Sequence, residues 1–386
     1  MLSLVIVLAF AACGDKETPV EPPAADNTKP EVSTDNAKPE EEPQTAEKTD
    51  LKITMIVNGN LGDRGLFDSG AAGLAKLKED IGIDYKIIET GADPSKWEPA
   101  LTDAADESDV DIVIALSPSM GEHMQKIAPM YPEKSFILLD ATVDHAADDL
   151  SNVYSATFKQ NEGSYLAGVL AASVTKSDLP NANEENIIGF VGGMDVPVIN
   201  DFLVGYIQGA QFVDPEVKVA NTFVGDYYNP AKGKEFGIVL ANQKADIIFA
   251  AAGETGLGVI EAAQENDCYI VGVDADQAAQ YEADGDMEKA NIILSSMMKN
   301  VGDIIYRSVN MHIAGTLPYG SHEELGVKEG GIGLAKNDIF NKNVPEEIRA
   351  KIEEAEKKVA SGEVEVGTAI GMPVAELETF RNSVKP

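Results

Sequence analysis

The feature that most constrains the fold is a regular alternation of short β-branched runs with longer amphipathic stretches, beginning at residue 51. Residues 53–57 have the pattern of a strand, a Gly-rich turn follows, and the apolar spacing predicts a helix over about 67–80. The alternation runs to residue 140 and starts again after residue 160. Alternating strands and helices imply parallel sheets with helices on both faces, so we predict an α/β protein with two similar lobes. The expected strands are 53–57, 85–88, 111–116, 135–140, 187–191, 217–223, 246–251, 269–273 and 291–294.

A chain of 386 residues is long enough for two such lobes. The run 152–158 lies between the two series and is expected to cross from one lobe to the other, which gives a clamshell. We place lobe 1 at residues 51–157 and 295–321, and lobe 2 at 158–294 and 322–386. Open parallel sheets bind ligands at the carboxyl ends of their strands, so the ligand site is expected where the two sheets face each other.

Charge and cysteine content exclude several classes of protein. Lys and Arg number 30 against 65 Asp and Glu, a net charge of −35 that repels polyphosphates, so no nucleic-acid partner is expected. Cys13 and Cys268 are the two cysteines, too few for a disulfide framework or a thiolate metal cluster.

The first residues predict a secretory signal. Residues 1–12 are uncharged, too short for a transmembrane helix, and typical of a signal h-region. Ala11 and Ala12 directly before Cys13 resemble the lipobox of bacterial lipoproteins, in which the cysteine is acylated. Phe10 stands where Leu is usual, and no basic residue precedes the run. A buried apolar element is the alternative interpretation.

Residues 14–50 are interpreted as a tether behind the lipidated Cys13. They hold six prolines, eleven acidic and four basic residues, and no aromatic residue. Such a segment cannot bury enough apolar surface to offset the entropy of ordering it. Its net charge is −7, which leaves −28 for residues 51–386, so the folded part is itself acidic.

Several polar segments follow predicted strands. Gly253–Gly258 opens a helix, but its G-x-x-G-x-G spacing is not the dinucleotide-binding fingerprint. We interpret these glycines as allowing the backbone to approach a neutral ligand closely, with simple helix–strand packing as the alternative. Asp274 and Asp276 end a strand, where one could hold vicinal hydroxyls and the other cap a turn. Asp140 ends its strand in the same way, and Lys299 lies near the expected lobe junction.

Phe67 and Phe202 each lie a few residues past a strand, where a ring facing the cleft could stack on a planar ligand; core packing is the alternative.

The sequence holds few motifs that indicate catalysis. The four histidines have no metal-binding spacing, and no G-x-S-x-G or S-x-x-K motif occurs. Paired carboxylates could act as acid and base, but acidic residues are too common here for their proximity to indicate this. We expect a binding protein without cofactor or metal, not an enzyme.

Together these segments resemble the basic membrane protein family of nucleoside-binding substrate-binding lipoproteins of ABC transporters. The resemblance covers about residues 51–335. It depends on Asn58, Asp63–Ser69, Asn161–Gly168, Val191–Ile199, Phe202, Ala252–Gly256, Gly272–Gln277, Ser296 and Lys299.

The resemblance implies a type I periplasmic-binding-protein fold that clamps a purine or other nucleoside between its lobes. The residues it implies are Phe67 and Phe202 around the base, Asp68 and Asp140 at the base edge, Asp274, Gly253 and Lys299 at the ribose, and Asn58 on the cleft wall. The usual D-x-S-F-N motif is here Asp63–Phe67, so Leu66 or Phe67 could hold the stacking position. Asp276 could likewise replace Asp274.

These expectations describe a monomeric receptor, lipid-anchored on the extracytoplasmic face of the cell membrane, that delivers a nucleoside to an ABC permease. Carboxylates in the cleft should repel nucleotides. Two alternatives remain open: a receptor for a sugar or an autoinducer-like furanose on the same fold, and a nucleoside-processing enzyme or surface adhesin.

Overall fold

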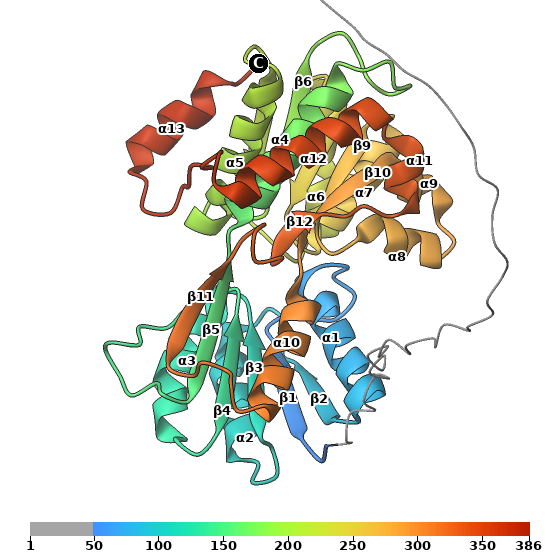
Figure 1. Cartoon of the computed structure of the whole chain (residues 1–386). Coiled ribbons are helices and arrows are strands. Elements are labelled where there is room, and N and C mark those ends of the chain that lie inside the picture. The colour runs from blue at the N-terminus through green and yellow to red at the C-terminus, as the bar shows by residue number, and fades with distance from the viewer. Residues whose placement is uncertain (1–48) are drawn as a thin grey trace, which may run out of the picture. The chain divides into compact units, whose positions relative to one another are not determined.

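The computed structural model describes residues 49–386, which form two lobes, each built on a six-stranded sheet (Figure 1). In the first sheet the order is β11-β5-β4-β3-β1-β2, and every paired strand is parallel to its neighbour. The central strands are buried on both faces, which explains their unbroken apolar runs. The strands are β1 (Lys52–Val57), β2 (Asp84–Glu89), β3 (Ile112–Leu116), β4 (Ser135–Leu139), β5 (Val153–Phe158) and β11 (Ser321–Leu325).

The second sheet repeats this architecture with the order β12-β10-β9-β8-β6-β7. Its strands are parallel except for β12, which pairs antiparallel with β10. The predicted α/β class with two parallel-sheet lobes is therefore confirmed. The strands are β6 (Ile187–Gly192), β7 (Lys218–Phe223), β8 (Ile247–Ala251), β9 (Tyr269–Asp274), β10 (Ile293–Lys299) and β12 (Ile332–Leu334).

Helices flank both sheets, as Figure 1 shows. The first helix buries residues spaced three or four apart, so one stripe faces the sheet. The helices are α1 (Leu66–Ile81), α2 (Trp97–Asp106), α3 (Gly121–Ile127), α4 (Gln160–Thr175), α5 (Pro197–Val213), α6 (Pro230–Asn242), α7 (Thr255–Glu265), α8 (Gln277–Ala283), α9 (Met287–Ile292), α10 (Val301–Ile313), α11 (Asp338–Asn343), α12 (Glu346–Ser361) and α13 (Val374–Ser383).

The chain crosses between the lobes after β5, after β10 and after β11 (Figure 1). Two predicted boundaries were wrong. Residues 295–299 belong to β10 in the sheet of lobe 2, and residues 322–325 belong to β11, which pairs with β5 in lobe 1. The apolar pattern identifies a strand but not the sheet that it joins. Lobe 1 therefore comprises residues 49–158 and 300–325, and lobe 2 residues 159–299 and 326–386.

Helices α4 and α5 of lobe 2 approach each other closely because glycines face the partner backbone. A Cβ atom on Gly205 would lie 2.1 Å from the carbonyl oxygen of Asn161, and one on Gly209 would lie 1.9 Å from that of Tyr165. No larger residue fits without separating the helices. This contact fixes α5, the helix that carries Phe202.

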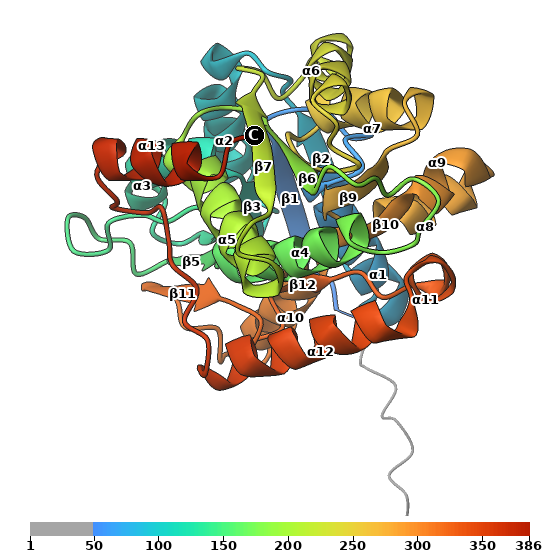
Figure 2. The ribbon, with the colours of Figure 1, turned by 90° about the horizontal axis from the view of Figure 1, so that it is seen from above.

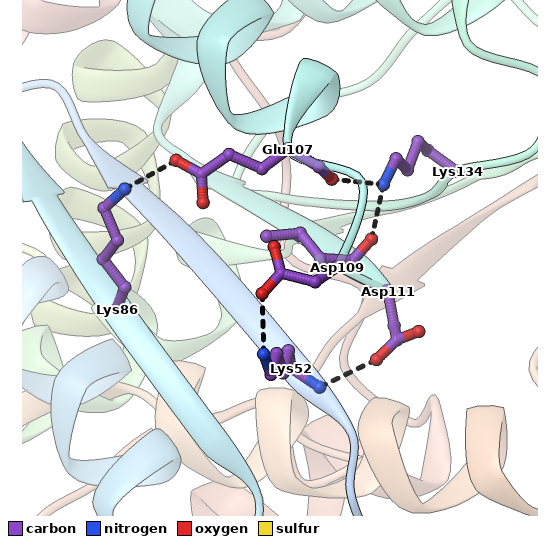
Figure 3. A network of polar contacts seen from close by, with 7 residues as sticks. Lys52, Lys86, Glu107, Asp109, Asp111 and Lys134 are labelled. Atoms are coloured by element: carbon purple, nitrogen blue, oxygen red, sulfur yellow. Dashed lines mark hydrogen bonds and ion pairs between the residues drawn. The ribbon is translucent and has the colours of Figure 1, made fainter.

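A polar network lies at the amino-terminal ends of the lobe 1 strands (Figure 3). The Nζ of Lys134 donates to the carbonyl oxygens of Glu107 and Val110, at 2.6 and 2.7 Å. Lys52 pairs with Asp109 at 2.6 Å. Because this end of the sheet is opposite the carboxyl ends of the strands, the network stabilises the base of the lobe and does not contribute to the cleft.

Candidate ligand-binding cleft

A cavity of about 620 Å³ lies between the lobes, in the range of about 300–1,000 Å³ that is usual for small-molecule sites. Residues from both sheets line it at the carboxyl ends of strands, which is where parallel sheets bind ligands. The lining residues Asn58, Ser117 and Asp140 follow β1, β3 and β4, whereas Gly253, Asp274 and Lys299 lie at or just beyond the ends of β8, β9 and β10.

Two phenylalanines reach the cavity from opposite lobes. Phe67 comes from α1 and is 7% exposed, and Phe202 comes from α5 and is 2% exposed. Both rings also pack into the core, and the centroid of Phe202 lies 6.1 Å from that of Phe249. Each ring therefore contributes both to the core and to the cavity wall. Leu66 lines the cavity beside Phe67.

Asp63 fixes the position of Phe67. Its carboxylate accepts hydrogen bonds from the backbone N–H groups of Gly65, Phe67 and Asp68 at 3.0 to 3.1 Å, which satisfies donors at the start of α1. Burial raises the pKa of Asp63, and the three backbone hydrogen bonds oppose that rise. The side chain lines the cavity, yet its hydrogen bonds indicate that it orders the loop.

The cleft does not include Asp68, so its predicted place at the base edge needs correction. Its carboxylate accepts from the backbone N–H of Gly62 at 2.8 Å and of Arg64 at 2.9 Å. These bonds turn the side chain toward the loop outside the cavity. The reason is local: Arg64 has a left-handed φ of 51°, and the backbone N–H groups of this turn are the donors that the Asp68 carboxylate accepts from.

Asp274 is the carboxylate that faces the cavity, whereas Asp276 caps α8. Asp276 accepts from the N–H of Ala279 at 3.1 Å and from Asn337 at 2.7 Å. Asp274 has a φ of 64°, and within residues 49–386 its buried Oδ1 has no hydrogen-bond partner. Burial raises the pKa of Asp274 to about 7, Lys299 opposes that rise, and Asp140 adds to it. Asp274 therefore brings to the cavity wall a carboxyl group with one oxygen that lacks a partner among residues 49–386.

Lys299 and Asp140 form a buried ion pair beside Asp274. The Nζ of Lys299 lies 2.8 and 2.9 Å from the two carboxylate oxygens of Asp140. It also lies 5.1 Å from the centroid of Phe202, within the range of a cation–π contact. The lysine is thus already paired, and the cavity offers a bound phosphate no free positive charge among these residues.

Asn58 lies at the junction of the lobes. Its Oδ1 accepts from the hydroxyl of Ser117 at 2.9 Å, which fixes the amide, and its backbone oxygen accepts from the hydroxyl of Tyr228 at 2.9 Å. Tyr228 belongs to lobe 2, so this bond crosses the cleft. Gly253, with a φ of 58°, brings its backbone to the wall next to Tyr227.

The sequence analysis missed Tyr227 and Tyr228, which both line the cavity. Burial raises the pKa of Tyr227, and the negative charge of Asp140 adds to that effect. The available signal was their place just after the predicted strand 217–223. The apolar residues Met194, Val196–Ile199 and Ile370 also line the cavity. Ile370 lies more than 100 residues further along the chain than the others.

Arg64 joins the lobes at the side of the cleft. Its guanidinium lies 4.3 Å from the centroid of Tyr281 and forms an ion pair with Asp284. Its backbone oxygen accepts from the Nε2 of Gln277 at 3.2 Å. These contacts, with the Tyr228 bond, hold the two lobes together over the cavity.

Across residues 49–386, no group of three or more His, Cys, Asp or Glu side chains is arranged to hold a metal ion. In the same part of the chain, no helix has both the length and the apolar character needed to cross a bilayer.

Proteins of similar sequence occur in several bacteria. The "ABC transporter nucleoside-binding protein BmpA" of Lactococcus lactis is 28% identical over 336 residues, covering 83% of this chain and 90% of that protein. "Basic membrane protein D" of Borreliella burgdorferi is 30% identical over 300 residues, covering 76% and 81%. The "CD4+ T-cell-stimulating antigen" of Listeria monocytogenes is 28% identical, covering 82% and 88%.

Solved structures confirm the predicted type of fold. An ABC transporter solute-binding protein from Aeropyrum pernix superposes with a TM-score of 0.74 at 24% identity, covering 87% of this chain and 99% of that one. The family model described as "ABC transporter substrate-binding protein PnrA-like" matches residues 50–368, most of the chain. The chain therefore belongs to the Bmp family of PnrA-like ABC transporter substrate-binding proteins.

Proposed function

We propose that this substrate-binding protein captures nucleosides, with purine nucleosides preferred, between its two lobes. The observation that carries the proposal is the combination in one cavity of a phenylalanine from each lobe with the Asp274 carboxylate and the Asp140–Lys299 pair. Flat heterocycles gain stacking and apolar burial against such rings. A buried carboxylate oxygen that lacks a hydrogen-bond partner favours binding of a ligand with hydroxyl donors.

Asp274, Lys299 and Gly253 are proposed to contact the ribose, and Phe67 and Phe202 to enclose the base. Asp140 is proposed to contact the edge of the base, and Asn58 to line the cleft wall. Asp68, the other residue expected at the base edge, does not line the cavity.

The cavity favours nucleosides over nucleotides. Its carboxylates face the ligand, and Lys299 is neutralised by Asp140 at 2.8 Å. A phosphate there would meet negative potential with no free cation to pair with it. Calorimetric titration with adenosine, guanosine, inosine, uridine, their 5′-monophosphates and D-ribose tests this. We expect nucleosides to bind at least tenfold more tightly than monophosphates, about 1.4 kcal/mol; absence of binding by every nucleoside refutes the proposal.

Ring stacking separates this function from sugar binding. Phe67→Ala and Phe202→Ala should each weaken nucleoside binding roughly 10- to 100-fold, because the base loses apolar contact area. Phe212→Ala is the matched control, since Phe212 is half exposed on α5 and lies outside the cavity. If D-ribose or a furanose bound tightly and the variants bound it normally, the sugar-receptor alternative would replace this one.

We also propose that the protein binds without chemical turnover, acts as a monomer, and is anchored on the extracytoplasmic face through acylated Cys13, where it meets its permease. Cys13 lies outside the described residues. Chromatography of incubated nucleoside should recover it intact; hydrolysis would point to an enzyme. Labelled palmitate should mark the wild type and not Cys13→Ser. Light scattering should give the monomer mass.

A further inference from the structure

The C-terminal segment, defined here as residues 363–386, packs against the lobe 2 wall of the cleft. It follows α12 and contains α13, which lies beside α5 when the molecule is viewed from above (Figure 2). The family match ends at residue 368, so α13 lies outside it. The residues that this segment contacts are neighbours of residues that line the cavity.

The first contact is with Asp201 in the first turns of α5. The hydroxyl of Thr368 and the backbone N–H of Ala369 donate to its Oδ1, at 2.5 and 2.8 Å. Asp201 is buried and directly precedes Phe202. Ala369 and Leu377 bury themselves against Val204, one turn further along α5. The segment is therefore fixed to the part of α5 that carries the cavity phenylalanine.

The second contact is made by Arg381 of α13. Its Nη1 donates to the side-chain oxygens of Asp195 and Asn200, both at 2.9 Å. Asn200 in turn donates to Asp195 at 2.7 Å and to the backbone oxygen of Val196 at 3.1 Å. These bonds close a polar network around residues 193–200, which form the loop before α5 and the first turn of that helix. Five of these residues, Met194 and Val196–Ile199, line the cavity.

Ile370 lies between these two contacts in the sequence. Its side chain lines the cavity and is 54% exposed. A side chain that both lines the cavity and faces solvent stands at its mouth. A bound ligand would cover part of this apolar surface, which would favour binding.

We propose that the C-terminal segment is part of the ligand site: Ile370 covers the ligand at the mouth, and Arg381 is a positioning residue that holds the 193–200 wall. The role of Ile370 in ligand affinity rests on the proposed nucleoside binding, whereas the positioning role of Arg381 does not. A segment that only stabilised lobe 2 would leave both the affinity and the local mobility of the wall unchanged.

Ile370→Ala tests the contact at the mouth, with Ile313→Ala as the matched control. Ile313 is 48% exposed on α10 of lobe 1 and does not line the cavity. Calorimetry uses the nucleoside that the wild type binds most tightly. Ile370→Ala should bind it about three- to tenfold more weakly through lost apolar contact, and Ile313→Ala as the wild type does. Equal affinity of the wild type and Ile370→Ala overturns the role of Ile370.

Hydrogen exchange of the unliganded protein tests Arg381. Arg381→Ala should accelerate amide exchange of residues 193–200 severalfold, while β3 in lobe 1 exchanges as in the wild type. Arg381→Lys should show intermediate exchange, because a lysine cannot bond the oxygens of both Asp195 and Asn200 in the same way. Unchanged exchange at 193–200, or equal acceleration throughout the molecule, overturns the positioning role. If the wild type binds no nucleoside, the proposed function fails and the exchange comparison alone decides this inference.

Discussion

Ligand affinity is expected to rise with pH through neutrality because of Asp274. The pKa of this buried side chain is raised to about 7, chiefly by burial, and its Oδ1 has no hydrogen-bond partner in residues 49–386. A ligand that donates hydroxyl hydrogens to Asp274 binds the ionised carboxylate more strongly than the protonated group, because a hydrogen bond to a charged acceptor is stronger. Protonation of Asp274 therefore competes with binding.

The magnitude follows from the ionised fraction. With a pKa of about 7, roughly one tenth of the molecules carry the ionised carboxylate at pH 6 and roughly nine tenths at pH 8. If only the ionised form binds, the apparent dissociation constant is divided by that fraction. Affinity should thus fall about tenfold from pH 8 to pH 6, and binding at pH 6 should release close to one proton.

Calorimetry from pH 5.5 to 8.5, in buffers of different ionisation enthalpy, measures both quantities. Asp274→Asn should bind weakly with little pH dependence. Asp276→Asn is the matched control, because Asp276 caps α8 and does not line the cavity, and it should keep the wild-type slope. A wild-type affinity that is flat across this range, or an Asp274→Asn variant with an unchanged slope, would refute the reasoning.

Three further predictions concern stability and closure. The pKa of Asp274 in the folded protein lies above its ordinary value of 3.8, so the folded protein binds an extra proton and its free energy of unfolding falls as pH rises from about 4 to 7. In urea titrations at pH 8, Asp274→Asn should be more stable than the wild type by on the order of 2–4 kcal/mol. Equal stability of the two proteins would contradict this. Lys299→Met leaves Asp140 buried and unpaired and should cost about 3–5 kcal/mol, a loss that Asp140→Asn in the same chain should partly restore; a melting temperature equal to the wild type's would count against it. Arg64→Ala removes contacts to Tyr281 and Asp284 across the cleft, so stopped-flow measurements should show faster ligand release, and an unchanged release rate would exclude a closing role.

The sequence predicted which strands end at the cleft and most of the wall residues. Asn58, Asp140, Gly253, Asp274 and Lys299 all line the cavity, because each lies at or just after the carboxyl end of a strand and parallel strands bring those ends to one edge. It could not choose between neighbouring carboxylates. Asp68 and Asp276 bond to nearby backbone instead, because local turns decide which way each side chain points.

The sequence by itself determined the α/β class, the two-lobed repeat and the position of the cleft, since periodicity and strand ends are local properties of the chain. Only the tertiary structure decided which sheet β10 and β11 join, and that Tyr228 meets Asn58 across the cleft. It also decided that a C-terminal segment, through Ile370, reaches a cavity built mostly by earlier residues. Contacts between residues so far apart depend on how the lobes pack, and no local pattern of side chains encodes them.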